Sequence, residues 1–330
     1  MYKNLDGNEL ISLRKPYKDI HTYIYIYMEF TGYKQTYRNY LPIGHYDLII
    51  ISLVHQGPEM VYYMVENIKK YVKGSFLWVV HYNNEQKIDE NTLPPWAWIV
   101  RDTIKTERHT RLLLMALNQT LKFALNNTRS INIMTLSSGS AFFREFIVPT
   151  KKKVSLILHE NIIALPGKNY GHSEEIDICH LGNCTQYLES IGAGGWHYKF
   201  GADSDFEFND MVTKRGFKYL RGTQWSGQIW PYEVGCMLKD DLSELETSNL
   251  RLGYACEELY MSTYAHNYAK DNDISIDLVQ VIIDWGNKYE IEDINYINNL
   301  RDTCTMEGSA VCKLPDNINS DVRKYLILPD

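Results

Sequence analysis

The stretch DLIIISLV at residues 47–54 decides the fold. It is a continuous apolar run rich in β-branched residues, which is typical of a strand covered on both faces of a sheet. Residues 56–58 break the run, and apolar side chains at helical spacing follow over residues 59–71. The same alternation continues with strands at 76–81 (FLWVVH) and 96–100, a long amphipathic helix at 106–125, and a strand at 131–136.

This order of strands and helices predicts an α/β fold with a mostly parallel sheet and helices on its faces. The short connections favour a single nucleotide-binding half of the Rossmann type. Neither GxGxxG after the first strand nor GxxxxGK[ST] occurs. The sequence therefore argues against a dinucleotide-dependent dehydrogenase and a P-loop NTPase.

The second half of the chain is less regular. Residues 169–210 are rich in Gly, His, Asp and Asn and are long enough to be a binding loop. No internal repeat or low-complexity linker separates the two halves, so we expect an N-terminal extension at 1–45 and one domain at 46–330. The later elements we expect are a strand at 224–230, a helix at 231–242 with Pro231 at its first position, helices at 257–268 and 291–300, a strand within 274–285, and a closing element at 319–327.

Composition restricts the class of protein. The formal net charge is −7, whereas a dedicated nucleic-acid binder normally has a basic excess. The apolar run at 22–30 is shorter than the roughly 20 residues that a membrane span needs, and the first residues lack the apolar core of a signal peptide. We therefore expect a soluble, cytoplasmic protein with no transmembrane anchor. The six cysteines are scattered, which favours buried thiols over a zinc site.

The strand at 131–136 ends in an unusual turn, written INIMTLSSGSAFF at 131–143. Open α/β sheets place their ligands at strand ends of this kind. This turn offers only serines and a glycine, without a carboxylate, cysteine or histidine. A metal site at the turn is therefore not expected.

Six stretches, in order, resemble a known family: the core-2/I-branching β-1,6-N-acetylglucosaminyltransferases and peptide O-xylosyltransferases of glycosyltransferase family 14. The resemblance covers residues 47 to 326. The chain departs from the family pattern at Asn83, at Ala255 and Cys256, at Glu258, and at Cys312. The matching stretches are LIIISLVHQGPEMVYYMVENI (48–68), FLWVVHYNNE (76–85), INIMTLSSGSAFF (131–143), RGTQWSGQIWPYEVGCML (221–238), YACEELYMSTY (254–264) and SAVCKLPDNINSDV (309–322).

The resemblance implies a GT-A-like fold and an inverting, metal-independent transfer of a sugar from a UDP-sugar to a hydroxyl of a glycan or protein. N-acetylglucosamine or xylose is the implied sugar, and no cofactor is required. The family motif places the catalytic glutamate at Glu257, with Glu258 as the fallback, and its phosphate-binding lysine at Lys313. A second cation should exist, and Lys288 and Arg301 are the candidates. The implied donor-site residues are His55, Gln56, His81, Asn83, Ser138, Gly139 and Ser140, and the implied sugar or acceptor contacts are Gln224 and Trp225. Trp285 is a further candidate on chemical grounds alone, because an aromatic face suits the apolar face of a sugar ring.

The chemistry of the reaction is consistent with these residue types. Transfer to a hydroxyl requires a base that takes the proton, and cations that stabilise the departing diphosphate. Each assignment nevertheless has a structural alternative. Glu257 and Glu258 can be first-turn acids that complement a helix dipole, and the tryptophans can be core residues. His55 and His81 can be hydrogen-bonded structural histidines.

Two other functions remain open. Asp203 and Asp205 spell an Asp-x-Asp motif that could hold a metal, since hard cations prefer oxygen ligands. They follow a poor strand and come late in the chain, so we expect a solvated loop there rather than a metal-dependent GT-A glycosyltransferase. The departures at residues 255, 256 and 312 leave open a catalytically degenerate protein that binds glycans or has a structural role.

Overall fold

The computed structural model describes residues 44–100, 106, 112–157, 176–177, 211, 214–221, 223, 225–245, 256–279, 293–303 and 310–329. All of them belong to the compact unit Leu41–Asp330. Its first strand begins at Gly44, two residues before the expected domain start at 46. Within the described residues, no helix is both long enough and apolar enough to cross a membrane.

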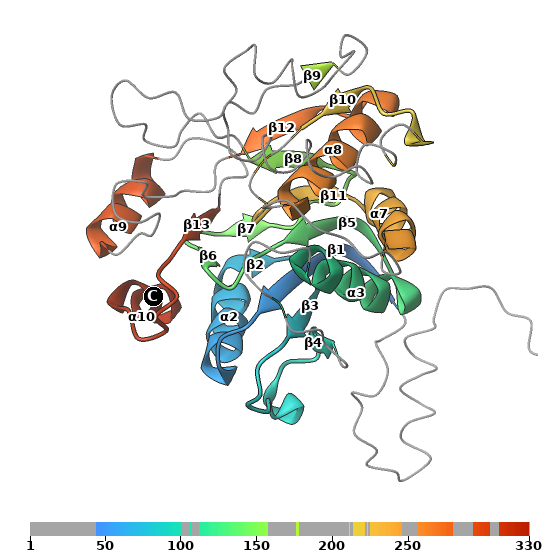
Figure 1. The fold of residues 1–330 in the computed structure, drawn as a ribbon. Coiled ribbons are helices and arrows are strands. Elements are labelled where there is room, and N and C mark those ends of the chain that lie inside the picture. Colours follow the sequence, from blue (N-terminus) through green and yellow to red (C-terminus); the bar gives the residue numbers. More distant parts are fainter. Residues whose placement is uncertain are drawn as a thin grey trace, which may run out of the picture. The chain divides into compact units, whose positions relative to one another are not determined.

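A seven-stranded sheet forms the centre of this unit (Figure 1). The strand order is β12-β8-β11-β5-β1-β3-β4. β5, β1, β3 and β4 are parallel, β8 and β12 are parallel to each other, and β11 is antiparallel to both of its neighbours. The strands are β1 (Gly44–Val54), β3 (Phe76–Tyr82), β4 (Ala97–Val100), β5 (Thr128–Thr135), β8 (Val154–Ile157), β11 (Ile229–Pro231) and β12 (Ile276–Val279).

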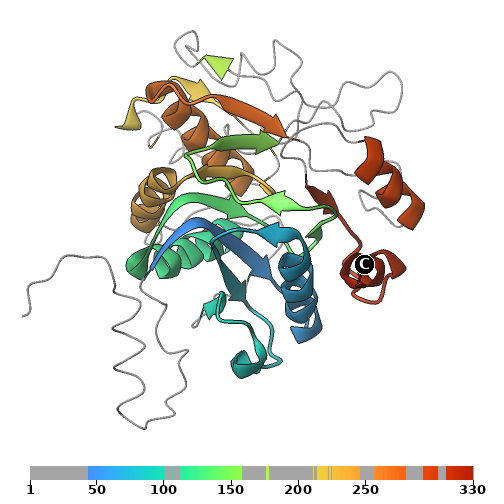
Figure 2. The same cartoon turned by 180° about the vertical axis from the view of Figure 1, so that it is seen from behind.

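Helices cover both faces, so the prediction of a mostly parallel α/β sheet is confirmed, and the arrangement is compatible with a Rossmann-like fold (Figure 2). The helices and the 3-10 turn are α2 (Pro58–Tyr71), η1 (Glu90–Thr92), α3 (Leu112–Asn127), α7 (Tyr232–Leu245), α8 (Cys256–Asp271), α9 (Ile294–Thr303) and α10 (Asp321–Ile327). Short two- and three-residue strands complete the structure: β2 (Val72–Lys73), β6 (Ser140–Phe142), β7 (Phe146–Ile147), β9 (Ile176–Asp177), β10 (Tyr219–Leu220) and β13 (Val311–Lys313).

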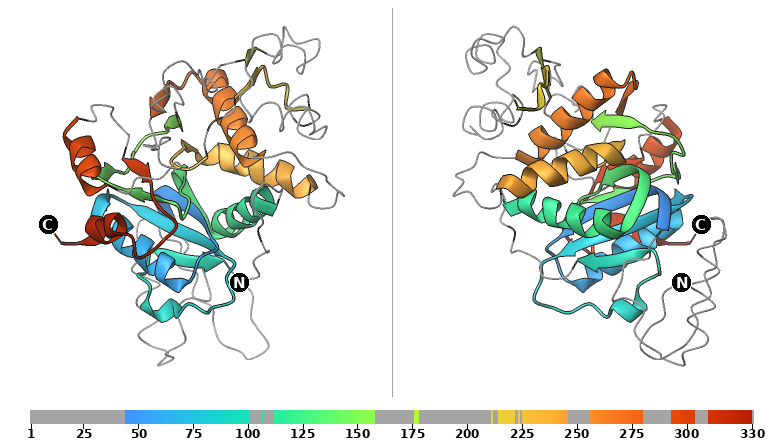
Figure 3. Two further views of the ribbon diagram at one scale, coloured as in Figure 1. Left: turned by 60° about the vertical axis from the view of Figure 1, so that its left-hand side comes forward. Right: turned by 90° about the vertical axis from the view of Figure 1, so that its right-hand side faces the viewer.

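β1 is buried on both faces, as its sequence predicts. Leu48 and Ile50 pack into an apolar cluster with α2, α9 and α10, while Ile49 and Ile51 pack into a second cluster with α3, α7 and α8. All four side chains are fully buried. The right-hand view of Figure 3 shows α3, α7 and α8 layered on the second face. Because successive strand side chains point to opposite faces, one β-branched run supplies both halves of the core.

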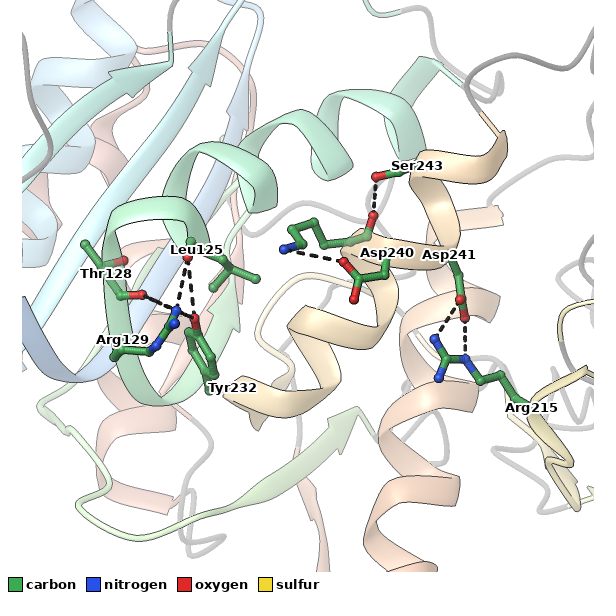
Figure 4. A network of polar contacts seen from close by, with 9 residues as sticks. Leu125, Thr128, Arg129, Arg215, Tyr232, Asp240, Asp241 and Ser243 are labelled. Atoms are coloured by element: carbon green, nitrogen blue, oxygen red, sulfur yellow. Dashed lines mark hydrogen bonds and ion pairs between the residues drawn. The ribbon is translucent and has the colours of Figure 1, made fainter.

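Polar contacts fix α7 in this layer, and Figure 4 shows them. At its first residue, the hydroxyl of Tyr232 meets the guanidinium of Arg129 beside the start of β5. Near its end, Asp241 accepts two hydrogen bonds from Arg215, at 2.8 and 2.7 Å. The expected helix start at Pro231 is wrong, because Pro231 is the last residue of β11 and pairs with Asn132 of β5.

α8 is unusual because it is polar and yet almost entirely buried. Ser262, Thr263 and His266 have no exposed surface, and Asn267 has 3%. Some partners lie within the helix, since Ser262 Oγ donates to Glu258 O at 2.7 Å. Others come from the segment before β11: Thr263 Oγ1 donates to Arg221 O at 3.1 Å, and His266 Nδ1 lies 3.2 Å from Arg221 Nη1. A buried polar helix is costly unless its groups are satisfied, so this one marks a part of the fold that is not merely core.

The last described segment returns to the end of β5. β13 pairs antiparallel with β6, with Lys313 opposite Ser140. The amide of Asn67 on α2 holds β6 from the other side, because it donates to Phe142 O at 2.9 Å and accepts from Phe142 N at 2.8 Å. This small two-stranded sheet brings residues from the end of the chain to the central sheet.

Candidate functional site

The carboxyl ends of β1, β3 and β5 lie at one edge of the sheet, because these strands are parallel. β11 runs the opposite way, so the residues just before it lie at the same edge. Gly227 N donates to Thr135 O at 2.6 Å, and Trp225 O accepts a hydrogen bond from the hydroxyl of Thr135. This edge is where open α/β sheets bind ligands, and most of the described candidate residues gather there.

The turn at residues 137–140 (the serine turn) lies in the middle of this edge. Its hydroxyls are bonded to one another: Ser137 Oγ lies 2.9 Å from Ser140 Oγ, and Ser226 Oγ donates to Ser140 Oγ at 3.0 Å. Ser137 N donates to Ser226 Oγ at 3.0 Å. These contacts tie the turn to the segment before β11 and fix its backbone.

Two backbone N–H groups of the turn are available as hydrogen-bond donors among the described residues. Its carbonyl groups are used, since Ser140 N donates to Ser137 O, and Leu314 N donates to Gly139 O at 2.8 Å. Among the described residues, the N–H groups of Ser138 and Gly139 have no hydrogen-bond partner. Ser138 is only 3% exposed. Buried backbone N–H groups are nearly always paired, so this turn is suited to a ligand that accepts hydrogen bonds.

Lys313, which the resemblance implies is the phosphate-binding lysine, lies directly over this turn. A Cβ atom placed on Gly139 would be 2.9 Å from Lys313 Nζ and 3.2 Å from its Cε. Glycine at this position therefore gives the lysine room to lie against the backbone. The half-buried ammonium group and the two N–H donors together form a compact positive site.

Arg323 is a second cation at the turn, and the sequence did not point to it. It is fully buried in α10, where Nη2 donates to Ser138 O at 3.1 Å and Nε to Pro315 O at 2.6 Å. Its guanidinium stacks over the Tyr63 ring at 4.9 Å from the centroid. Burial lowers the pKa of Arg323, and nearby Tyr63 and Asp316 act in the opposite direction. Among the described residues Nη1 has no hydrogen-bond partner.

Arg301, a candidate for the second cation, has a different place. Its guanidinium donates to Phe143 O at 2.7 Å, to Tyr71 Oη at 2.6 Å and to Tyr325 Oη at 3.2 Å. These contacts join α9 to α2, to α10 and to the end of β6 remote from Lys313. Phe143 lies three strand positions, about 10 Å, from Ser140, the residue paired with Lys313. The contacts of Arg301 therefore favour a structural role, and Lys288 lies outside the described residues.

The end of β1 contributes Gln56, whose Nε2 donates to Asp316 Oδ1 at 3.1 Å. That aspartate oxygen would lie 3.4 Å from a Cβ on Gly139, so Gln56 and Asp316 both reach the serine turn. His55 is exposed, and its carbonyl accepts from Asn84 Nδ2 at 3.0 Å. Gln56 is thus placed with the turn, and Asp316 is a further residue that the sequence did not indicate.

The end of β3 is less favourable to the predicted donor contacts. His81 is 1% exposed, and Nε2 lies 3.1 Å from Gln119 Oε1 of α3. Burial lowers the pKa of His81, so the imidazole is neutral at physiological pH. Of the two roles open for His81, the geometry favours the structural one. Asn83 is half-buried and donates from Nδ2 to Thr106 Oγ1 at 2.6 Å.

Glu257 and Glu258 lie in the first turn of α8, and each is 6% exposed. Burial and the negative charge of Glu258 raise the pKa of Glu257 to about 8. Glu257 Oε2 has no hydrogen-bond partner among the described residues. First-turn acids that serve only a helix dipole are normally solvated, so burial argues against that simpler explanation.

A chain of polar contacts leads from the backbone carbonyl of Glu258 toward the serine turn. Thr223 N donates to Glu258 O at 3.3 Å, and Gln228 Nε2 donates to Thr223 Oγ1 at 2.9 Å. Gln228 stands two residues after Ser226, which bonds to Ser140. The start of α8 and the serine turn are therefore parts of one connected polar region at the sheet edge.

Besides Lys288, four predicted residues lie outside the described part of the chain: Gln224, Trp285, Asp203 and Asp205. Trp225 is described and half-buried, and it packs against the apolar cluster of α3, α7 and α8, which favours its role as a core residue. Among the residues that the structure describes, no group of three or more His, Cys, Asp or Glu side chains could hold a metal.

The connected region has a positive end at Lys313 and Arg323 and an acidic end at Glu257 and Glu258. An anion with several acceptor oxygens suits the first end, and a group that gives up a proton suits the second. No family model matches this chain, and no curated protein matches it.

Proposed function

We propose that the protein is a glycosyltransferase that moves a sugar from a UDP-sugar to a hydroxyl group. The observation that carries the proposal is the serine turn, where two backbone N–H groups that have no partner among the described residues lie beside Lys313 at the carboxyl edge of a parallel sheet. The resemblance to glycosyltransferase family 14 places the phosphate-binding lysine at the same residue. Lys313 is therefore the proposed phosphate-binding residue both by its position at the turn and by the resemblance.

The diphosphate of the donor would lie on the serine turn. The N–H groups of Ser138 and Gly139 would donate to its oxygens, and Lys313 would neutralise charge as it develops on the leaving group. Arg323 is proposed as a positioning residue. It donates hydrogen bonds to Ser138 O in the serine turn and to Pro315 O after β13, and so fixes these two segments relative to each other. The cations replace a metal in this scheme, which is proposed as metal-independent.

Glu257 is the proposed general base. In the transfer, a hydroxyl oxygen of the acceptor forms a bond to the anomeric carbon, and the bond from that carbon to the phosphate oxygen breaks with its electron pair leaving on UDP. The hydroxyl proton goes to the Glu257 carboxylate. With a pKa of about 8, Glu257 is in its carboxylate form in only a minority of molecules at neutral pH, and the fraction able to act as base increases as the pH rises toward 8. Attack opposite to the leaving group inverts the anomeric centre.

The finer assignments follow the resemblance. The proposed architecture is GT-A-like, the sugar is N-acetylglucosamine or xylose, and the acceptor is a glycan or glycoprotein. The antiparallel strand β11, inserted between β5 and β8, brings the segment with Thr223 and Gln228 to the serine turn. That insertion is what connects the acidic end to the positive end.

Calorimetric titration with UDP tests the proposal. Wild-type protein should bind UDP equally with and without EDTA, and Lys313→Met should weaken binding about tenfold or more because a charge-assisted contact is lost. The exposed Lys324→Met on α10 is the matched control and should bind like wild type.

Absence of UDP binding by the wild-type protein would refute the nucleotide assignment. Binding that disappears in EDTA would instead favour the metal-dependent alternative with Asp203 and Asp205. A thermal-shift screen of UDP-sugars then identifies the donor, since a ligand of the folded state raises the melting temperature.

A further inference from the structure

A carboxylate stands at the positive end of the site, where the proposed function has no use for one. Asp316 Oδ1 accepts a hydrogen bond from Gln56 Nε2 at 3.1 Å, and it would lie 3.4 Å from a Cβ on Gly139. Lys313 Nζ would lie 2.9 Å from the same point. The carboxylate and the ammonium group therefore face the same small space over the serine turn.

The side chain of Asp316 is exposed and is therefore not kept at the turn by packing in the core. The hydrogen bond from Gln56 keeps it there. Its negative charge also acts on Arg323 beneath the turn. An anion bound to the N–H groups of Ser138 and Gly139 would thus meet two cations and one fixed negative charge. The repulsion from Asp316 grows with the charge that the anion carries.

We propose that Asp316 is a specificity-determining residue of the serine turn, which weakens the binding of highly charged phosphates and so favours release of the free nucleotide. The nucleotide's identity rests on the proposed function, whereas the effect on a bare diphosphate does not. In a UDP-sugar each phosphate carries one negative charge. Free UDP has an ionisable terminal phosphate, with a second pKa of about 6, and therefore carries nearly one more charge at neutral pH.

The consequence for turnover follows from this difference. Breaking the bond between sugar and phosphate adds negative charge at the turn, just where Asp316 lies. Asp316 therefore opposes the product more strongly than the substrate. Product release limits the rate of many enzymes, so a residue that weakens product binding selectively has a clear use.

The test compares Asp316→Asn with wild type by calorimetry, with four probes: uridine, UDP, UDP-N-acetylglucosamine and inorganic pyrophosphate. Removing the charge should tighten UDP and pyrophosphate about two- to fivefold, the range for exposed charge pairs. UDP-N-acetylglucosamine should tighten less, and uridine should not change. The gain should shrink at high salt, because salt screens exposed charges.

Asp321→Asn is the matched control, since it removes the same charge from an exposed site five residues further on. It should leave all four affinities unchanged. Equal or weaker UDP and pyrophosphate binding in Asp316→Asn would overturn the inference, because the carboxylate would then be neutral to the ligand or a contact for it. If Asp316→Asn and Asp321→Asn gained the same affinity for UDP and pyrophosphate, the effect would come from net charge alone. That result would also overturn the inference.

The outcomes separate the two proposals. If pyrophosphate tightens in Asp316→Asn while UDP binds neither protein, the inference holds and the nucleotide assignment fails. If UDP binds wild type but does not tighten in the variant, the proposed function stands and the inference fails. If neither probe binds wild type, both fail.

Discussion

The serine turn and the start of α8 belong to one polar region, yet they handle buried charge in opposite ways. At the turn, the buried guanidinium of Arg323 donates to two backbone carbonyls and stacks on an aromatic ring. At α8, two adjacent carboxyl groups are buried together, and the pKa of Glu257 rises as a result. One end keeps its positive charge, and at the other Glu257 keeps a proton until the pH approaches about 8.

This difference indicates that the two ends have different chemical roles, anion binding at one and proton exchange at the other. A site that only bound an anion would need the positive end alone. A site that only stabilised the fold would satisfy its buried acids with nearby cations, as Arg215 satisfies Asp241. The presence of both ends in one region is the reason for proposing group transfer rather than simple binding, and variants at each end test that proposal.

The largest expected effect is on the acidic end. Glu257→Gln keeps the shape of the side chain but removes its ability to accept a proton. Transfer should fall about 10²- to 10⁴-fold, while UDP binding stays unchanged. A radiochemical or coupled transfer assay measures the first quantity, and calorimetry the second.

Glu66→Gln is the control for this variant, because Glu66 is an exposed glutamate on α2 and should keep full activity. If Glu257→Gln kept full transfer activity, Glu257 would not be the base, and Glu258 would be the next candidate.

The second effect concerns the pH dependence of stability. Because the pKa of Glu257 is raised to about 8 in the folded state, the folded protein keeps a proton that the unfolded chain loses near its ordinary pKa. The stabilisation is present at low pH and is lost as pH rises toward about 8, with a slope of up to about 1.4 kcal/mol per pH unit. Urea unfolding at pH 5, 6.5, 8 and 9 measures it.

Glu257→Gln cannot lose this proton, so its free energy of unfolding should fall less over the same pH interval. The two proteins should show parallel curves above about pH 8. Parallel curves over the whole range would mean that Glu257 titrates normally in the folded state.

The smallest of the three effects is at the positive end. Arg323→Met removes two hydrogen bonds from a charged donor and leaves Ser138 O and Pro315 O without that partner. The free energy of unfolding should fall by about 2–3 kcal/mol, and UDP binding should weaken because the turn is no longer held. Lys324→Met changes a neighbouring exposed cation and should shift stability by less than about 0.5 kcal/mol. If Arg323→Met and Lys324→Met were equally stable, Arg323 would not be a positioning residue.

The first half of the fold could be read from the sequence. β1, α2, β3, β4 and β5 are each found within three residues of their predicted bounds. These elements have long apolar patterns and pair with neighbours close in the chain, so local sequence carries enough information. The placement of Gln56 and residues 138–140 at one sheet edge follows from the parallel order alone.

The second half could be read only in part. The helices at 257–268 and 291–300 are confirmed as α8 and α9 within a few residues, but β6 and β13 have three residues each and were missed. Such short strands have no pattern of their own and form only because each supplies the other's hydrogen bonds. Arg323 and Asp316 were missed for the same reason: nothing near them in sequence says that they meet residues of β1 and β5.

The bond from Arg323 to Ser138 joins residues 185 positions apart. Closing so long a loop is entropically costly, and contacts of this kind are among the slowest to form as a chain folds. The central strands can pair before the segment with β13 and α10 arrives. The proposed anion site therefore forms late in folding, after most of the sheet, and binding of a phosphate ligand would favour the final docking step.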